Sequence, residues 1–292
     1  MDPLIDEAFL QRLANLKFIV KGRRHGRLSG AHSSPRAGVS VEFSDYRDYT
    51  PGDDFRYVDW NIVGRLDRVL VKSFVHEVDL PIYILLDLSA SMRLGDPPKV
   101  HYAARLAAAI SYLGLRGLDR VGIYPFSGTL HASVTPRHGM RQMAHILRIL
   151  RRVSPRGETS IDHALSEFAA HSHESGLVFL ISDFLTPGGY DRGLLNLLHR
   201  GNEVVVVQVL DPAEIRPELD GSTRLADVEN DRHLEINVGP GVLAQYERRL
   251  NAHLDRLAEF LTDHHIPYFL TPTDLPLEEL IHHRWRQGGV LK

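Results

Sequence analysis

The chain of 292 residues contains no cysteine. This absence excludes disulfides, thiolate metal sites and cysteine nucleophiles, and it is typical of proteins from a reducing compartment. No run of eighteen consecutive apolar residues occurs, so no membrane-spanning helix is expected. The start of the chain, MDPLIDEAF, carries acids where a signal peptide needs a basic start and an apolar run. We therefore expect a soluble, cytoplasmic protein.

The composition of the chain is not extreme, and several common motifs do not occur in it. Hydrophobic residues make up 43% of the chain and charged residues 24%, which is ordinary for a globular protein. The net charge of -3 gives no overall attraction to nucleic acid or to an anionic membrane. The sequence has no G-x-x-x-x-G-K-[ST], no G-x-G-x-x-G and no H-E-x-x-H, so nucleotide and zinc-protease sites lack support.

Charge is nevertheless uneven near the start of the chain. Residues 8–41 contain seven lysines and arginines and no acid, whereas residues 42–59 contain six acids and two arginines. The basic segment 12–36 could serve as an arm that binds nucleic acid. Alternatively, the two blocks neutralise each other in the fold, or the glycine-rich loop is simply solvated. We favour these latter interpretations and do not expect nucleic acid as a partner.

From residue 81 onward, short apolar runs alternate with segments of helical periodicity. Runs such as EVVVVQVL, apolar on both faces, are typical of central parallel strands. The pattern predicts strands at 81–87, 120–127, 129–136, 176–183, 203–211 and 266–274, and helices at 99–115, 139–153, 161–173, 190–199, 243–264 and 277–286. The expected fold class is α/β: an open, mostly parallel sheet with helices on both faces and one antiparallel edge strand.

Two regions depart from this alternation. Two alternating runs within 212–239 predict a β-hairpin inserted before the long helix. The N-terminal part predicts an α+β segment with a helix over 4–20, a loop rich in glycine and serine over 22–38, and extended chain at 39–43 and 69–76. We therefore expect a segment 1–80 packed on the main domain, a domain over 81–275, and a C-terminal helix and tail over 276–292.

Five oxygen-bearing side chains fall in loops at one edge of the predicted sheet. Asp87, Ser89 and Ser91 follow the first strand, Thr159 precedes a helix, and Asp183 ends the strand 176–183. Because open α/β sheets bind ligands outside the carboxyl ends of their strands, we expect these loops to converge. An all-oxygen set suits a hard cation such as Mg²⁺, with Mn²⁺ also plausible, whereas zinc would want histidine or cysteine.

The expected chemistry of this site is binding rather than turnover. If the three hydroxyls coordinate directly and the two carboxylates hold bound waters, the inner shell is neutral and the ion stays strongly electrophilic. Such an ion seeks an anionic oxygen for an open position. An Asp or Glu side chain of a protein partner would supply it.

Two other interpretations of these residues remain. Ser89 or Ser91 could be the nucleophile of a serine hydrolase, but no glycine flanks D-L-S-A-S-M to form a strained elbow, and no histidine is placed to activate either serine. Each residue could also be a helix cap or a turn former. That interpretation explains the residues singly but not their expected convergence, so we favour a metal site without enzymatic activity.

The sequence D-L-S-A-S, followed by Thr159 and Asp183 in order, resembles the metal-ion-dependent adhesion site of von Willebrand factor type A domains. The order of strands and helices over 81–275 is similar to that domain as well. The resemblance implies a Mg²⁺-dependent protein-binding surface to which the partner contributes a carboxylate.

The stretch 38–74 resembles the signature of the family called domain of unknown function 58. The matching residues are Glu42-Phe43, Arg47 to Tyr49, Gly52-Asp53-Asp54, Arg56 and Asp59-Trp60. Many members carry membrane helices, so this chain is similar to the shorter, soluble type. The resemblance implies an adaptor or co-chaperone that acts with a MoxR-type AAA+ ATPase in assembling or activating protein complexes in bacteria.

Residues 42–60 contain too many acids and arginines for a core. These charged residues also alternate too closely with aromatic residues for an ordinary surface. We expect a small ion-paired subdomain. A sharper hypothesis makes it a docking face for the ATPase, with these candidate partner-binding residues: Arg47, Asp53, Asp54, Arg56, Asp59 and Trp60.

Overall fold

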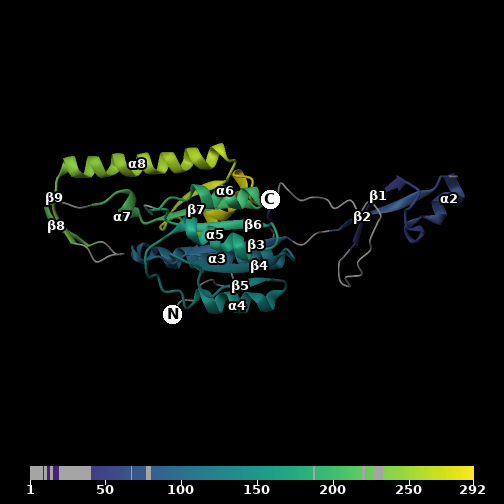
Figure 1. The fold of residues 1–292 in the computed structure, drawn as a ribbon, viewed down its shortest axis with the longest axis horizontal. Helices are drawn as coiled ribbons and strands as arrows, with labels where there is room; N and C mark the ends of the chain where they lie inside the picture. Colours follow the sequence, from purple (N-terminus) through teal and green to yellow (C-terminus); the bar gives the residue numbers. More distant parts are fainter. Residues whose placement is uncertain are drawn as a thin grey trace. The chain divides into compact units, whose positions relative to one another are not determined.

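The structure, a computed structural model, divides into two compact units (Figure 1). The first comprises Met1–Val20 and Leu80–Lys292, and the second comprises Lys21–Asp79. The first twenty residues are thus grouped with the main unit, which differs from the single division at residue 80 expected from the sequence. The structure describes Phe9, Arg12, Leu13 and residues 16–19, 41–66, 68–76, 80–186, 188–218, 221–226 and 233–292. The basic segment 12–36 lies mostly outside these described residues.

A six-stranded sheet forms the centre of the first unit, in the order β10-β7-β6-β3-β4-β5. Its strands are β3 (Pro81–Asp87), β4 (Arg120–Phe126), β5 (Val134–Arg137), β6 (Leu177–Ser182), β7 (Glu203–Leu210) and β10 (Tyr268–Pro272). All neighbouring pairs are parallel except β4 and β5, which are antiparallel. The predicted open, mostly parallel sheet with one antiparallel edge strand is confirmed.

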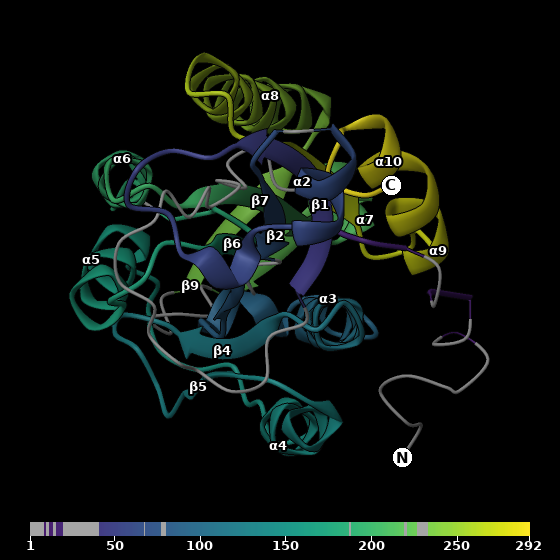
Figure 2. The same ribbon diagram turned by 90° about the vertical axis from the view of Figure 1, so that its right-hand side faces the viewer.

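Helices cover both faces of this sheet (Figure 2). The helices are α3 (Lys99–Arg116) and α4 (Met140–Leu150) on one face, and α5 (Ile161–His171), α6 (Asp191–His199) and α8 (Pro240–Asp263) on the other. Strand β3 contributes side chains to the hydrophobic cores on both faces of the sheet. Ile82 and Ile84 belong to the core under α3 and α4, and Tyr83 and Leu85 belong to the core on the other face. Because successive strand side chains point to opposite faces, a strand covered on both sides is apolar throughout, as the sequence of β3 is.

The two chain regions near the termini pair with each other. Phe18 bridges Leu291, and the backbone N–H of Lys17 donates to the carbonyl of Lys292 at 3.2 Å. Residues 16–19 are therefore extended, and the helix predicted over 4–20 is wrong at its end. The chain end follows α9 (Leu277–Glu279), a π turn at Leu280–Arg284 and α10 (Trp285–Gln287). Trp285 is fully buried there and stacks on Phe179 of β6.

Between β7 and α8 the chain makes two further elements. A short helix, α7 (Pro212–Ile215), begins with a capping box formed by Asp211 and Glu214. The strands β8 (Gly221–Ala226) and β9 (His233–Val238) then form an antiparallel pair, as the predicted inserted hairpin requires. Sequence analysis did not predict α7, although a capping box can be recognised in D-P-A-E.

The second unit is built around an antiparallel pair of strands, β1 (Val41–Asp48) and β2 (Leu70–His76). A 3-10 turn, η1 (Phe55–Tyr57), and the helix α2 (Trp60–Leu66) connect them. The unit therefore has the α+β character expected for this part of the chain. None of the helices in the described part of either unit has the length and hydropathy needed to cross a membrane.

A substitution of Gly176, the residue before β6, can test how closely β6 packs against β3. A Cβ atom at this position would collide with the backbone carbonyl oxygen of Pro81, which cannot move without shifting the strand. We expect Gly176→Ala to lower the free energy of unfolding by about 1 to 3 kcal/mol, measured by urea denaturation. Gly241→Ala is the control, because nothing lies within 4 Å of its Cβ position. Equal stability of the two variants would contradict this account of the strand contact.

Candidate metal centre

Asp87 is the last residue of the central strand β3, and it is fully buried. Its Oδ1 accepts a hydrogen bond from the backbone N–H of Ser89 at 2.8 Å, and its Oδ2 accepts one from the Ser182 hydroxyl at 2.6 Å. Burial, followed by the nearby charge of Asp183, raises the pKa of Asp87 to about 7. The carboxylate is thus held by donors from two different strand ends.

The two serines of D-L-S-A-S lie together beyond this carboxylate. The Oγ atoms of Ser89 and Ser91 are 3.0 Å apart, and Ser89 is fully buried. Ser89 precedes a short 3-10 turn, η2 (Ala90–Arg93). The pair offers two hydroxyl oxygens close enough to bind one cation.

Backbone hydrogen bonds bring the loop of Thr159 against this turn. The N–H of Ala90 donates to the carbonyl of Gly157 at 2.9 Å, and the N–H of Arg156 donates to the carbonyl of Leu88 at 2.7 Å. The Thr159 hydroxyl oxygen is buried and has no hydrogen-bond partner among the described residues. Since a buried hydroxyl normally has a partner, this one is free to bind a group that the chain itself does not supply.

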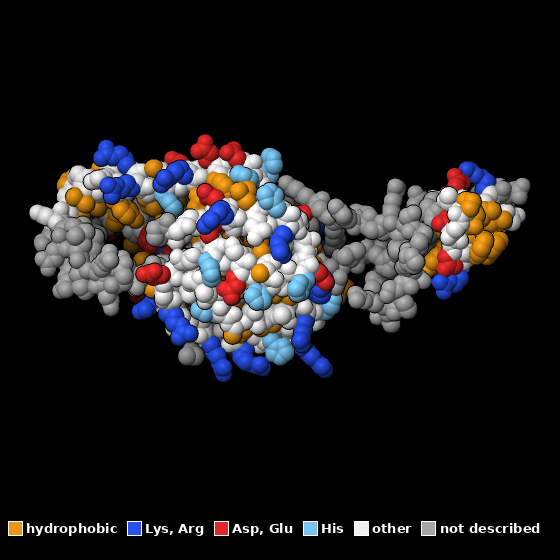
Figure 3. All heavy atoms as spheres, viewed as in Figure 1, with side chains coloured by type: hydrophobic (Ala, Val, Ile, Leu, Met, Phe, Trp, Pro, Cys, Tyr) orange, Lys and Arg blue, Asp and Glu red, His pale blue; other side chains and the backbone are white. Residues whose placement is uncertain are grey.

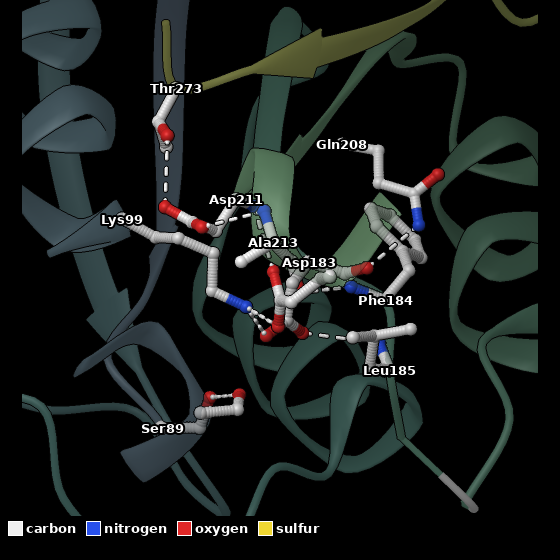
Figure 4. A network of polar contacts seen from close by, with 12 residues as sticks. Ser89, Lys99, Asp183, Phe184, Leu185, Gln208, Asp211, Ala213 and Thr273 are labelled. Atoms are coloured by element: carbon white, nitrogen blue, oxygen red, sulfur yellow. Dashed lines mark hydrogen bonds and ion pairs between the residues drawn. The ribbon is translucent and has the colours of Figure 1, made fainter. Parts of the chain in front are cut away.

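Asp183 directly follows β6 and is 1% exposed. Its Oδ1 accepts from the backbone N–H of Leu185 at 3.1 Å, and its backbone carbonyl accepts from Nε2 of Gln208 at 2.7 Å. Its Oδ2 lies 2.8 Å from the ammonium of Lys99 (Figure 4). Asp183 therefore stands at the predicted edge of the sheet, and Asp87 and Asp183 are near enough for their charges to interact.

Lys99 lies at the candidate site, and sequence analysis did not predict it there. It is the first residue of α3 and is fully buried, with its ammonium 2.7 Å from Oε1 of Glu214 as well as beside Asp183. Burial alone would lower the pKa of Lys99, but the charges of Asp183 and Glu214 outweigh it and raise the pKa. Burial also raises the pKa of Glu214, and the ammonium of Lys99 opposes that shift.

The donor set fits a hard divalent cation. Mg²⁺ and Mn²⁺ are bound by hydroxyl and carboxylate oxygens. The hydroxyl oxygen of Thr159, which has no hydrogen-bond partner among the described residues, is available as such a ligand. The described residues contain no group of three or more His, Cys, Asp or Glu that could hold a metal ion. A site of this kind must therefore rely on Ser89, Ser91 and Thr159, with Asp87 and Asp183 behind them.

A different serine has a histidine partner. Ser127, at the end of β4, lies with its Oγ 3.0 Å from Nε2 of His131. Burial, followed by the charge of Arg156, lowers the pKa of His131. No carboxylate hydrogen-bonds the other ring nitrogen within the described ranges, so the geometry lacks the third group of a catalytic triad. Ser89 and Ser91 hydrogen-bond each other instead of a base.

The candidate partner-binding residues of the second unit separate into two groups. Asp53 and Asp59 are each 9% exposed: Asp53 accepts from the N–H of Thr50 at 2.8 Å, and Asp59 accepts from the Tyr46 hydroxyl at 2.9 Å. Both carboxylates thus hold the unit's own turns together. Arg47 pairs through its backbone register with Val71 on β2.

The remaining candidates face solvent. Arg56 forms an ion pair with Asp54 at 2.6 Å, and its hydrogen bonds lower the pKa of that carboxyl. Trp60 and the neighbouring Phe55 are each 63% exposed. Figure 3 shows hydrophobic side chains gathered on this face of the second unit. An exposed group of large aromatics marks a candidate interaction surface.

The hydrogen bond from Ser182 to Asp87 can be tested by its removal. Ser182→Ala leaves the buried carboxylate of Asp87 with one donor fewer and the backbone N–H of Phe184 without its acceptor, so we expect the free energy of unfolding to fall by about 1 to 3 kcal/mol in chelator. Ser166→Ala removes an exposed hydroxyl that donates to the carbonyl of Asp162, and we expect it to change stability far less. Urea denaturation checks both. A Ser182 variant as stable as wild type would show that Asp87 does not need this donor.

Several known proteins are similar to this chain. Mb1516 of Mycobacterium bovis and Rv1480 of Mycobacterium tuberculosis, both called uncharacterized, are 28% identical over 276 residues, covering 92% of this chain and 86% of theirs. The conserved hypothetical protein BatB from Bacteroides thetaiotaomicron is 16% identical, covering 72% of this chain and 98% of its own at a TM-score of 0.46. An aerotolerance-related membrane protein from Bacteroides fragilis is 16% identical, covering 71% of this chain and 99% of its own at a TM-score of 0.44.

A family model also matches residues 45–256, which is most of the chain. The stretch includes the second unit from β1 onward and the sheet of the first unit up to α8. The chain belongs to the family described as "Protein of unknown function DUF58".

Proposed function

We propose that this chain is a non-enzymatic protein-interaction module that binds its partner through a Mg²⁺ ion. The observation that carries the proposal is the unpartnered, buried hydroxyl oxygen of Thr159 in a loop tied to the Ser89–Ser91 pair. When bound, the ion supplies an electrophilic centre for an anionic oxygen. The chain's own hydroxyls would hold the ion, while Asp87 fixes the backbone of Ser89 and both Asp87 and Asp183 would hold waters bound to the ion.

Binding fits this arrangement better than catalysis. The two carboxylates of the site already accept hydrogen bonds from within the chain, and Asp183 is also paired with Lys99. The Ser127–His131 pair, which lacks a third group, is explained as a local contact across the turn after β4. Because the hydroxyl ligands are neutral, they do not cancel the positive charge of the ion. An Asp or Glu side chain of a protein partner matches that charge.

The proposed partner is a MoxR-type AAA+ ATPase of the cytoplasm, as the resemblance of 38–74 implies, with the chain acting as adaptor or co-chaperone. Support comes from the exposed aromatics on the second unit, Phe55, Tyr57 and Trp60, and from the neighbouring ion pair of Arg56 with Asp54. Aromatic and arginine side chains are enriched where interfaces gain their binding energy. The docking surface proposed for the second unit therefore consists of Phe55, Arg56, Tyr57 and Trp60.

Cation binding is expected to depend on Thr159. Thr159→Ala removes a buried hydroxyl that has no hydrogen-bond partner among the described residues, so we expect Mn²⁺ affinity, measured by the loss of the free-ion EPR signal, to fall at least about tenfold. Ser160→Ala is a matched control, because Ser160 is the neighbouring hydroxyl and its side chain makes no capping hydrogen bond. Equal Mn²⁺ affinity of wild type and Thr159→Ala would remove this residue from the site.

The docking surface is expected to depend on Trp60. Trp60→Ala should weaken binding to a purified MoxR-type ATPase from the same organism by about 2 kcal/mol or more if Trp60 is a central anchor. Since the side chain is 63% exposed, we expect the free energy of unfolding to change by no more than about 0.5 kcal/mol. Leu118→Ala, at a residue 72% exposed on the first unit, is the control. Biolayer interferometry in Mg²⁺ and in chelator, without nucleotide, measures the binding, and urea denaturation measures the stability. Unchanged binding by Trp60→Ala refutes the surface.

A further inference from the structure

The ammonium of Lys99 is paired with two carboxylates beside the candidate metal centre. Its Nζ lies 2.8 Å from Oδ2 of Asp183 and 2.7 Å from Oε1 of Glu214, and the lysine is fully buried. An unpaired buried ammonium costs several kcal/mol, and so does an unpaired buried carboxylate. The three groups therefore stabilise one another in the absence of any added ion.

Both partners of Lys99 are fixed in place by the backbone. Asp183 is held through its Oδ1 by the N–H of Leu185, and Glu214 is held through its Oε2 by the N–H of Asp211 at 2.8 Å. The capping box of α7 keeps Glu214 oriented toward the lysine. Lys99 is thus paired with one carboxylate that follows β6 and with another that follows β7.

The charges of this cluster decide how a divalent cation is received. Asp87, Asp183 and Glu214 contribute three carboxylates and Lys99 one ammonium, so a formal charge of -2 remains. This net negative charge attracts a divalent cation. However, the ammonium already pairs with Oδ2 of Asp183, and its positive charge repels a cation that binds nearby.

We propose that Lys99 is a built-in competitor of the divalent cation: it neutralises Asp183 when the site is empty and weakens cation binding when an ion enters. The inference rests on the proposed function, because it concerns the same site. As a consequence, the chain's own oxygens bind the cation only weakly. An additional carboxylate from a bound partner then contributes a large share of the cation's stabilisation.

The test compares Mn²⁺ binding by the full chain in wild type, Lys99→Met and Lys17→Met, again by EPR. Lys99→Met removes the repelling ammonium and leaves Asp183 and Glu214 without a counter-charge, so we expect Mn²⁺ to bind at least about tenfold tighter. Mg²⁺ should also raise the melting temperature of Lys99→Met more than that of wild type. Lys17→Met, at an exposed lysine, should behave as wild type.

A double variant keeps the test decisive if Lys99→Met fails to fold without an ion. Lys99→Met with Glu214→Gln restores the formal charge of -2, and we expect it to fold and still to bind Mn²⁺ more tightly than wild type. Binding by folded lysine variants that is equal to or weaker than that of wild type overturns the inference but leaves the metal site standing. If neither wild type nor any variant binds Mn²⁺, both the inference and the proposed function fail.

Discussion

The buried carboxylate of Asp87 is the constraint around which the edge of the sheet is organised. It ends the central strand, where water cannot reach it, so its oxygens must be satisfied from within the chain. The N–H of Ser89 fixes the turn after β3, and the hydroxyl of Ser182 fixes the end of β6. These bonds place Asp183 close to a second negative charge, and Lys99 supplies the positive charge that makes this tolerable.

The main domain could be predicted from the sequence because its signals are local. Apolar runs define the strands, and Asp87, Ser89, Ser91 and Asp183 can be placed at the carboxyl edge because each follows such a run. Lys99 could not be predicted, since a lysine at the start of an amphipathic helix is normally solvated. Its two partners stand 84 and 115 residues away in the chain, and no periodicity reports a contact of that kind.

The second unit shows a different limit of sequence interpretation. Asp53, Asp54 and Asp59 look alike in a block of acids and aromatics, yet two of them are buried in turns and Asp54 pairs with Arg56 at the surface. Asp53 accepts a hydrogen bond from the backbone N–H of Thr50, and Asp59 accepts one from the backbone N–H of Asn61. Composition predicts an ion-paired subdomain, but only the turn geometry separates the structural acids from the exposed ones.

The long helix α8 is attached to the surroundings of the candidate metal centre at two points. The Tyr246 hydroxyl donates to the carbonyl of Glu214 at 2.6 Å, and Nε2 of His253 lies 3.0 Å from the carbonyl of Phe184. Phe184 follows Asp183, and Glu214 is the second carboxylate at Lys99. The helix that follows the β8–β9 hairpin is thus bonded on both sides of the Lys99 ion pairs. Any change in the ion pairs that displaces either segment must strain these bonds, so the site and α8 cannot move independently.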